Sequence, residues 1–254
     1  MTTALREKRP PQHHRTVDRV TRILEEVVYN PGMSFAELVR ALDAAKSSVH
    51  GFIRGLLANG WLYEDQRRFY LGPAVYGLTM ASGHIRAGLV TQESLLALQA
   101  ESGVAVFLGV QAGDHLIYIA EVGSDPVAGF DARSNIRRNL LVTAGGKALL
   151  AARSVAERES FLRRHSAEEA DLVGNFLAEL DEIRRGRLAY NTRQHGARFA
   201  IATAVQSPTG RAAASITLVG PTTQMEPRKQ ELSEMLLRHV DSWRKQPVVA
   251  REAI

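Results

Sequence analysis

The chain has 254 residues, of which 45% are hydrophobic and 23% are charged, a composition typical of a globular protein with a buried core. It contains no cysteine, which excludes disulfides, thiolate metal sites and a cysteine nucleophile, and we expect it in the reducing cytoplasm. The net charge is +5, and no stretch approaches the roughly 18 consecutive apolar residues of a membrane span, so we expect no membrane partner.

The chain begins with a basic arm. The first 15 residues have no apolar core and are not expected to act as a secretory signal, and their composition predicts a flexible segment over 1–15. Two roles fit it: it follows the DNA backbone or enters the minor groove, or it is a solvated tail. The basic side chains are Arg6, Lys8, Arg9, His13, His14 and Arg15.

Residues 16–72 predict a domain that starts with three helices. The first helix runs over Thr16–Tyr29, where apolar residues recur at helical spacing until Asn30-Pro31-Gly32 ends the pattern. Ser34 and Glu37 have the spacing of a capping box, which predicts that the second helix begins there.

A third helix is expected after the short turn Asp43-Ala44-Ala45. Apolar residues recur at helical spacing from Val49 to Leu57, and Asn59-Gly60 ends the helix because both residues tolerate a left-handed conformation. The opposite face is polar and basic. The second and third helices therefore predict a helix-turn-helix.

A basic hairpin follows the third helix. Aromatic runs at 61–63 and 69–71 predict two strands, and the connection over 64–68 has two arginines at its tip. Two helices followed by a hairpin form a winged helix-turn-helix, which lays its second helix in the major groove. We predict DNA contacts from Lys46, Ser47, Ser48, His50, Arg54, Arg67 and Arg68.

A linker helix is expected over 73–88, before a second domain over 89–246 and a tail over 247–254. The linker offers an apolar face for dimerisation or for packing on its own domain, and the sequence leaves both open. From Val104 the hydrophobic period changes to that of strands, and the order strands, helices, strands predicts an α+β sensor-like domain. The expected elements are two strands joined around 112–114, a strand over Val127–Phe130, a polar loop over 131–139, helices over 143–152, 154–164 and 167–185, a hairpin over 199–221 and a helix over Met225–Gln246.

Four segments together resemble the IclR family of bacterial transcriptional regulators over nearly the whole chain. They are Thr16–Leu24, Lys46–His50 with Tyr70–Gly72, Leu140–Ala151, and Ile201–Val205 with Ser215–Pro221. The resemblance implies an α+β fold with an N-terminal winged helix-turn-helix, a linker helix and a C-terminal GAF-like effector-binding domain. It also implies a homodimer or dimer of dimers that binds double-stranded operator DNA and responds to small metabolites, many of them carboxylates or aromatic acids.

Several positions depart from the family pattern. Gly51 stands where the family usually has Arg, and Arg193 stands where it typically has Glu. Four further departures make the pocket less polar, and with Arg193 we expect it to suit a bulkier or aromatic carboxylate. These four positions are Ala200, Ala204, Thr217 and Val219.

The effector is expected between the 131–147 segment and the sheet. The Thr143 hydroxyl and the N–H groups at the start of the helix over 143–152 suit a carboxylate, although a close-packed glycine turn without a ligand fits the same residues. The predicted effector residues are Leu141, Thr143, Ala144, Gly145, Gly146, Arg193, Ala200, Ala202, Thr217 and Val219.

No catalytic residue, metal site or cofactor is expected. The segment Thr143–Lys147 lacks the earlier glycine and the following hydroxyl of a phosphate loop, and there is no Gly-x-Ser-x-Gly elbow. We therefore expect a ligand-responsive regulator, taken as a repressor of a catabolic operon. The alternatives are a sensor that has lost DNA binding, suggested by Gly51, and a small α+β hydrolase or transferase.

Overall fold

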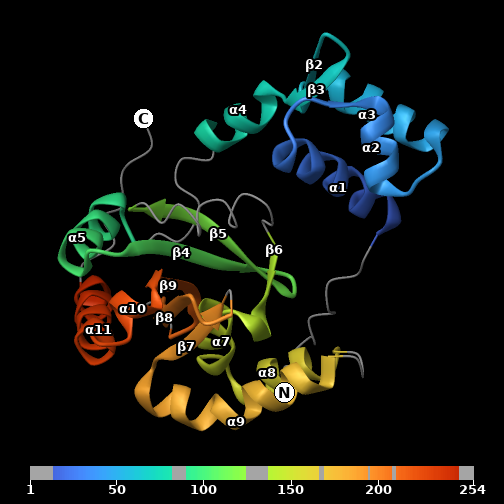
Figure 1. Cartoon of the computed structure of the whole chain (residues 1–254). Helices are drawn as coiled ribbons and strands as arrows, with labels where there is room; N and C mark the ends of the chain where they lie inside the picture. The colour runs from blue at the N-terminus through green and yellow to red at the C-terminus, as the bar shows by residue number, and fades with distance from the viewer. Residues whose placement is uncertain are drawn as a thin grey trace, which may run out of the picture. The chain divides into compact units, whose positions relative to one another are not determined.

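The computed structural model describes residues 14–81, 90–123, 137–165, 169–193, 195–207 and 210–245. The chain divides into two compact units, Met1–Gly83 and His84–Ile254, each with its own hydrophobic core (Figure 1). Most of the predicted basic arm, the second half of the predicted linker helix, the predicted strand over Val127–Phe130 and the predicted tail lie outside the described residues.

The N-terminal unit is a winged helix-turn-helix, as predicted. Its three-stranded sheet has the order β1-β3-β2, and buried apolar side chains from the first three helices and the hairpin form one core. The elements are α1 (Arg15–Tyr29), β1 (Met33–Ser34), α2 (Phe35–Leu42), α3 (Lys46–Ala58), β2 (Leu62–Asp65), β3 (Arg68–Leu71) and α4 (Pro73–Ala81).

The predicted capping box is confirmed at the start of α2. The Ser34 backbone N–H donates to Glu37 Oε2 at 2.7 Å, and the Glu37 backbone N–H donates to Ser34 Oγ at 3.4 Å. At the other end Asp43 adopts the left-handed conformation, with φ of 45°, which stops α2 and starts the turn to α3.

The tip of the hairpin is shorter than predicted. Gln66 and Arg67 have φ of 48° and 62° and form the whole turn, while Asp65 pairs with Arg68 across the strands. A two-residue turn with both residues left-handed matches the twist of the strands it joins, which favours this short connection. Arg68 is thus the first residue of β3 and not part of the tip.

The C-terminal unit is built on a six-stranded antiparallel sheet with the order β6-β5-β4-β9-β8-β7. The predicted hairpins are confirmed as β4 with β5 and as β8 with β9, and pairing of β4 with β9 joins them. The strands are β4 (Ala105–Ala112), β5 (His115–Val122), β6 (Arg137–Asn139), β7 (Ala189–Arg193), β8 (Arg198–Gln206) and β9 (Ala212–Pro221).

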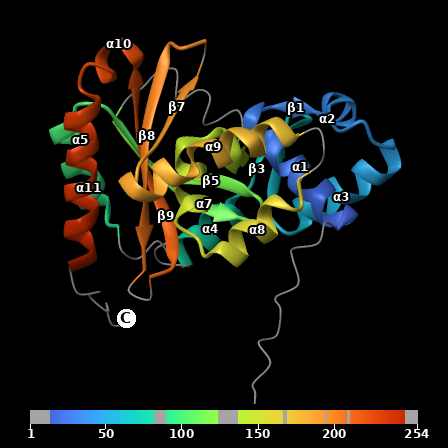
Figure 2. The same ribbon diagram turned by 90° about the horizontal axis from the view of Figure 1, so that it is seen from below.

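Helices cover both faces of this sheet. One core lies between the sheet and α5 with α11, and the other lies between the sheet and a layer that includes α7 and α9. Figure 2 shows β8 and β9 between α5 and α11 on one side and α7, α8 and α9 on the other. The helical elements are α5 (Gln92–Ser102), η1 (Leu140–Val142), α7 (Ala144–Ala151), α8 (Val155–Leu162), α9 (Ala170–Gly186), α10 (Thr222–Met225) and α11 (Lys229–Lys245).

Three parts of this unit differ from the sequence prediction. Arg137–Asn139 form the short strand β6 and not a loop, because they pair with Ile117, Leu116 and His115 of β5. Strand β7 was not predicted, and it is an edge strand that pairs with β8 alone among the described strands. The helix expected over Met225–Gln246 is α11, which begins later, at Lys229, and a separate short helix, α10, ends at Met225.

Candidate functional site

The polar face of α3 is the first candidate surface. Lys46, Ser47, His50 and Arg54 are exposed, while Ser48 is half-buried. The residue before the helix, Ala45, has no side chain that can accept a hydrogen bond from the first turn. The unpaired N–H groups of that turn and the exposed basic side chains give α3 a positive start, which is favourable beside a phosphate.

Two arginines of α1, which the sequence prediction did not include in the site, reach this region. Arg19 Nη1 donates to Ser48 Oγ at 3.3 Å, and Arg22 Nη2 donates to the Ala41 carbonyl oxygen at 3.3 Å. They line a cavity of about 190 Å³ beside the turn between α2 and α3. Arg19 and Arg22 are three residues apart, which places them on one face of α1, and this spacing could have identified them from the sequence.

The two wing arginines have different surroundings. Arg67 is exposed in the turn, whereas Arg68 Nη1 donates to the Gly32 carbonyl oxygen at 2.6 Å and lies 3.7 Å from Glu37 Oε2. Arg68 therefore ties the hairpin to the start of α2. The structure places only Arg67 of the two at the hairpin tip.

The second candidate surface is the sheet face beneath α7. A Cβ atom built on Gly145 would lie 2.8 Å from Ser215 Oγ and 2.9 Å from Thr217 Oγ1, so the first turn of α7 packs directly on β9. A Cβ on Gly146 would collide with the Leu140 carbonyl oxygen. Both glycines thus serve close packing, which brings the backbone of α7 against the sheet.

Thr143 caps α7, as predicted. Its hydroxyl accepts from the Gly146 backbone N–H at 3.2 Å and donates to the Asn139 carbonyl oxygen at 3.2 Å. That hydroxyl is thus already engaged within the chain. Helix geometry provides no partner inside α7 for the N–H groups of Ala144 and Gly145, and these remain suited to an anion.

Tyr118 lies on this face and was not predicted as a site residue. Burial raises the pKa of the Tyr118 hydroxyl, while Thr217 and the charges of Arg138 and Arg193 partly lower that pKa. Thr217 Oγ1 is buried and has no hydrogen bond of standard geometry with the described residues. Its hydrogen bond with the Tyr118 hydroxyl is therefore a weak one.

Two arginines stand side by side at one end of strands β7 and β8. Arg193 of β7 and Arg198 of β8 are direct cross-strand partners, and Arg193 is exposed. Arg198 lies two residues before Ala200, so it shares the face of β8 that α7 covers. The family pattern predicted Arg193 but not Arg198 or Arg138. Arg198 pairs with strand β7, which was not predicted, and Arg138 was expected in a loop.

The apolar residues predicted for the pocket all belong to the core under α7. Leu141, Ala144 and Ala202 are buried, with Ala202 0% exposed, while Val219 is only partly buried. Ala202 pairs with Thr217 and Ala200 with Val219 across β8 and β9. The predicted residues of the sheet are therefore neighbours, although Ala202 itself has no free surface.

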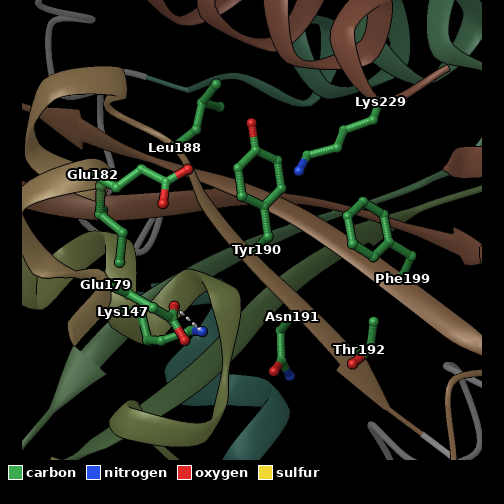
Figure 3. A pocket seen from close by; sticks show the side chains of 10 residues that line it. Lys147, Glu179, Glu182, Leu188, Tyr190, Asn191, Thr192, Phe199 and Lys229 are labelled. Atoms are coloured by element: carbon green, nitrogen blue, oxygen red, sulfur yellow. Dashed lines mark hydrogen bonds and ion pairs between the residues drawn. The ribbon is translucent and has the colours of Figure 1, made fainter. Parts of the chain in front are cut away.

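An ion pair and two cavities lie at the β7 edge of the same unit. Lys147 is buried in α7, and its Nζ lies 2.5 Å from Glu179 Oε2 of α9 (Figure 3). A cavity of about 350 Å³ extends from this pair to Tyr190, whose ring is 4.0 Å from Lys229 Nζ. A second cavity, of about 540 Å³, is lined by Leu141, Lys147 and Arg193 among others.

Within the described part of the chain, no group of three or more His, Asp or Glu side chains is arranged to hold a metal ion. The described helices also include none that is long and apolar enough to cross a membrane.

Comparison with known proteins agrees with this architecture. Residues 16–66 match the family model of the IclR helix-turn-helix domain, and residues 81–243 match that of the bacterial transcriptional regulator IclR C-terminal domain. The HTH-type transcriptional regulator BhcR of Paracoccus denitrificans is 27% identical over 221 residues, which cover 83% of this chain and 79% of BhcR.

Solved structures share the fold at low sequence identity. An IclR transcriptional regulator from Alicyclobacillus acidocaldarius has a TM-score of 0.69 at 17% identity, covering 92% of this chain and 100% of that one. An IclR homologue from Microbacterium hydrocarbonoxydans, solved with 4-hydroxybenzoate, has a TM-score of 0.69 at 18% identity, covering 90% and 97%. The matching domains are those of transcriptional regulators and not of enzymes, with a DNA-binding unit and an effector-binding unit. The chain belongs to the IclR family of bacterial transcriptional regulators.

Proposed function

We propose that this protein is a cytoplasmic repressor of a catabolic operon and that a small aromatic carboxylate is its effector. It binds operator DNA as a homodimer or a dimer of dimers, and the effector favours an arrangement of the subunits with lower affinity for DNA. An effector changes DNA affinity only by binding the two arrangements with different affinity.

The corner of Tyr118 and Thr217 is the observation that carries the proposed ligand class. The charges of Arg138 and Arg193 act on the Tyr118 hydroxyl, and the first turn of α7 packs on Thr217. A carboxylate bound there gains charge-assisted hydrogen bonds from guanidinium groups and from the free N–H groups of α7.

Aromatic rings beside the corner support an aromatic effector. The Phe107 and Tyr118 ring centroids are 5.2 Å apart with an interplanar angle of 54°, and both rings stand on neighbouring strands. Aromatic rings prefer offset or tilted packing of this kind, and an aromatic effector would make the same type of contact. The homologue from Microbacterium hydrocarbonoxydans, which shares the fold, was solved with 4-hydroxybenzoate.

We assign the DNA contacts to the exposed face of α3 and to the wing. Ser47 and His50 are proposed to contact base edges, and Arg54, Lys46 and Arg67 to contact phosphates. Arg54→Ala then weakens binding to all operator variants alike, whereas His50→Ala changes the preference among them by about 1–3 kcal/mol per affected base pair. Gel shifts with an operator and its single-base variants measure both effects, and a uniform loss for His50→Ala contradicts its assignment.

Dimer formation is proposed to involve α4. Tyr76 and Leu78 of this helix are 63% and 55% exposed, and because they are two residues apart they offer apolar contacts on different sides of the helix. A second copy of the chain is proposed to contact this helix, in agreement with the paired half-sites that helix-turn-helix proteins read. Analytical ultracentrifugation of Tyr76→Ser and Leu78→Ser tests the assignment, with a shift towards monomer expected.

A thermal-shift screen of aromatic and short aliphatic carboxylates, followed by gel shifts with each hit, tests the proposal as a whole. The expected result is a shift of the unfolding temperature by aromatic acids and a weaker operator complex in their presence. Preference for the aliphatic acids contradicts the ligand class. The second candidate, a sensor without DNA binding, is suggested by Gly51, and it predicts no gel shift at any salt concentration.

A further inference from the structure

The cavity of about 350 Å³ at the β7 edge is separate from the corner proposed for the effector, because neither Tyr118 nor Thr217 lines it. It opens around the edge of the sheet: Tyr190 and Phe199 belong to the core on the α11 side, whereas Ile183 belongs to the core on the α7 side. Its volume lies within the range of about 300–1,000 Å³ that small-molecule pockets have. The cavity is therefore large enough for a small metabolite of its own.

Two side chains of opposite charge line this cavity. Lys229 Nζ of α11 lies 4.0 Å from the centroid of the Tyr190 ring, and a cation in this position is attracted by the ring. Figure 3 shows the Glu182 carboxylate of α9 and the Lys229 ammonium group directed towards Tyr190 from opposite sides. Within the described part of the chain, Glu182 has no hydrogen bond or ion pair and Lys229 has no acidic partner. One unpaired carboxylate and one unpaired ammonium group thus face the same tyrosine ring.

A ligand that carries charges of both signs complements this pair. Its carboxylate bonds to Lys229 and its ammonium group to Glu182, and both are charge-assisted hydrogen bonds, which are stronger than neutral ones. A ligand with a single charge satisfies only one of the two side chains. An α-amino acid has both charged groups on one carbon atom, so it fits the arrangement with few atoms.

The edge of the sheet provides a second set of partners for such a ligand. Strand β7 pairs with β8 alone among the described strands, and an edge strand presents unpaired N–H and C=O groups on its outer side. Three successive residues of this edge, 190–192, line the cavity. The ammonium group of an amino acid donates to a carbonyl oxygen and its carboxylate accepts from an N–H group, as in the addition of a further strand.

The part of the cavity away from Lys229 is polar but has no net charge. Lys147 is buried and forms an ion pair with Glu179, so the two charges compensate each other. Asn191 Nδ2 donates to the Val142 carbonyl oxygen at 2.9 Å, which leaves the Asn191 side-chain oxygen to accept. The Thr192 hydroxyl has no hydrogen bond with the residues that the structure describes. These groups suit a hydroxyl or amide side chain.

We propose that this cavity is a second ligand site of the C-terminal unit and that it binds a zwitterionic α-amino acid with a neutral polar side chain. The carboxylate binds Lys229, the ammonium group binds Glu182, and the side chain lies towards Asn191 and Thr192. The ligand then contacts α9, β7 and α11 together, and it stabilises the unit by connecting helices that pack on opposite faces of the sheet.

A thermal-shift measurement on the full chain with L-serine, L-threonine, L-asparagine and L-glutamine is the first test, and a rise of the unfolding temperature is expected with at least one of them. Isothermal titration calorimetry then compares the amino acid that gives the largest rise with its N-acetyl derivative and with its α-carboxamide. The first derivative lacks the ammonium charge and the second lacks the carboxylate charge. Each is expected to bind about tenfold or more weakly than the free amino acid, because one charge-assisted contact is lost.

Two variants assign these preferences to the cavity. Glu182→Gln is expected to abolish the preference over the N-acetyl derivative, and Lys229→Gln is expected to abolish the preference over the α-carboxamide. Both side chains are exposed, so the variants are expected to fold. Asp181→Asn and Arg185→Gln remove charges from exposed positions of α9 that do not line the cavity, and they are expected to retain both preferences.

The absence of binding by all four amino acids overturns the inference. Equal affinity for the free amino acid and either derivative also overturns it, because the site would then not read both charges. A preference that survives in the variant expected to abolish it shows that the amino acid binds elsewhere, which likewise overturns the assignment to this cavity.

Discussion

At the scale of single residues, Glu37 makes the stability of the DNA-binding unit depend on pH. Hydrogen bonds from the Ser34 backbone N–H and hydroxyl, and the charge of Arg68, lower the pKa of Glu37 from its ordinary value of 4.5. A carboxyl group with a lower pKa in the folded state stabilises the fold above its unfolded pKa, and this stabilisation is lost as the pH falls through the folded pKa.

We therefore expect Glu37→Gln to narrow the difference in stability between neutral and acidic pH. Urea unfolding between about pH 3 and pH 7, followed by the fluorescence of Trp61 and Trp243, measures this difference. Glu64→Gln, at an exposed position of β2, is the matched control and is expected to retain the pH dependence of the wild type. An identical pH dependence in all three proteins contradicts the role of Glu37.

Gly51 is a second residue whose surroundings allow a sharp test. No atom lies within 4 Å of a Cβ built at this position, so α3 accepts a side chain there without a clash. Gly51→Arg is expected to raise operator affinity. It is also expected to steepen the salt dependence by about 0.9 in log K against log [salt] for each additional phosphate that the protein neutralises.

Gly51→Ala separates the charge from the backbone effect. It is expected to stabilise α3 by about 0.5–1 kcal/mol without changing the salt dependence. Gel shifts or fluorescence anisotropy over a range of salt concentrations compare the two variants. Identical slopes for the Arg and Ala variants would show that residue 51 does not reach a phosphate.

At the scale of elements, the wing gives different roles to Arg67 and Arg68, which are adjacent in sequence. Arg67→Ala is expected to weaken operator binding and reduce the salt slope while leaving the unfolding temperature unchanged, because the side chain is exposed in the turn. Arg68→Ala is expected to destabilise the unit by about 1 kcal/mol, because it leaves the Gly32 carbonyl oxygen without this donor. Differential scanning calorimetry measures the stability of both variants, and fluorescence anisotropy measures their operator affinity. A loss of stability in Arg67→Ala alone contradicts both assignments.

Elements with local signals were predictable, and those that depend on distant partners were not. The capping box at Ser34 and the cap at Thr143 depend on neighbours within three residues, so their residue types alone predict the helix starts. Strand β6 has only three residues, two of them Arg, and it exists because β5 provides its hydrogen bonds. Strand β7, Ala-Tyr-Asn-Thr-Arg, has little hydrophobic alternation because it lies at the edge of the sheet.

At the scale of the whole molecule, regulation requires coupling between the effector-binding and DNA-binding units. Thermodynamic linkage makes this coupling reciprocal: an effector that weakens operator binding by a given factor is itself bound more weakly by that factor on operator DNA. We expect a factor of about 5–150, the usual range for such switches. Calorimetric titration of the effector with and without saturating operator, compared with operator titrations with and without effector, measures both factors. Unequal factors at one fixed oligomeric state rule out coupling through a simple shift between two arrangements.

The sequence by itself determined the order of the domains, the helix-turn-helix and the absence of cysteine chemistry, because caps, hydrophobic periods and residue types are local properties of the chain. Only the tertiary structure decided which polar groups meet. It engaged Arg68 with the Gly32 carbonyl oxygen, and it placed Arg198 opposite Arg193 and Thr217 beside Tyr118. These encounters depend on strand register between segments far apart in sequence, and a register shift of one residue would turn each side chain to the other face.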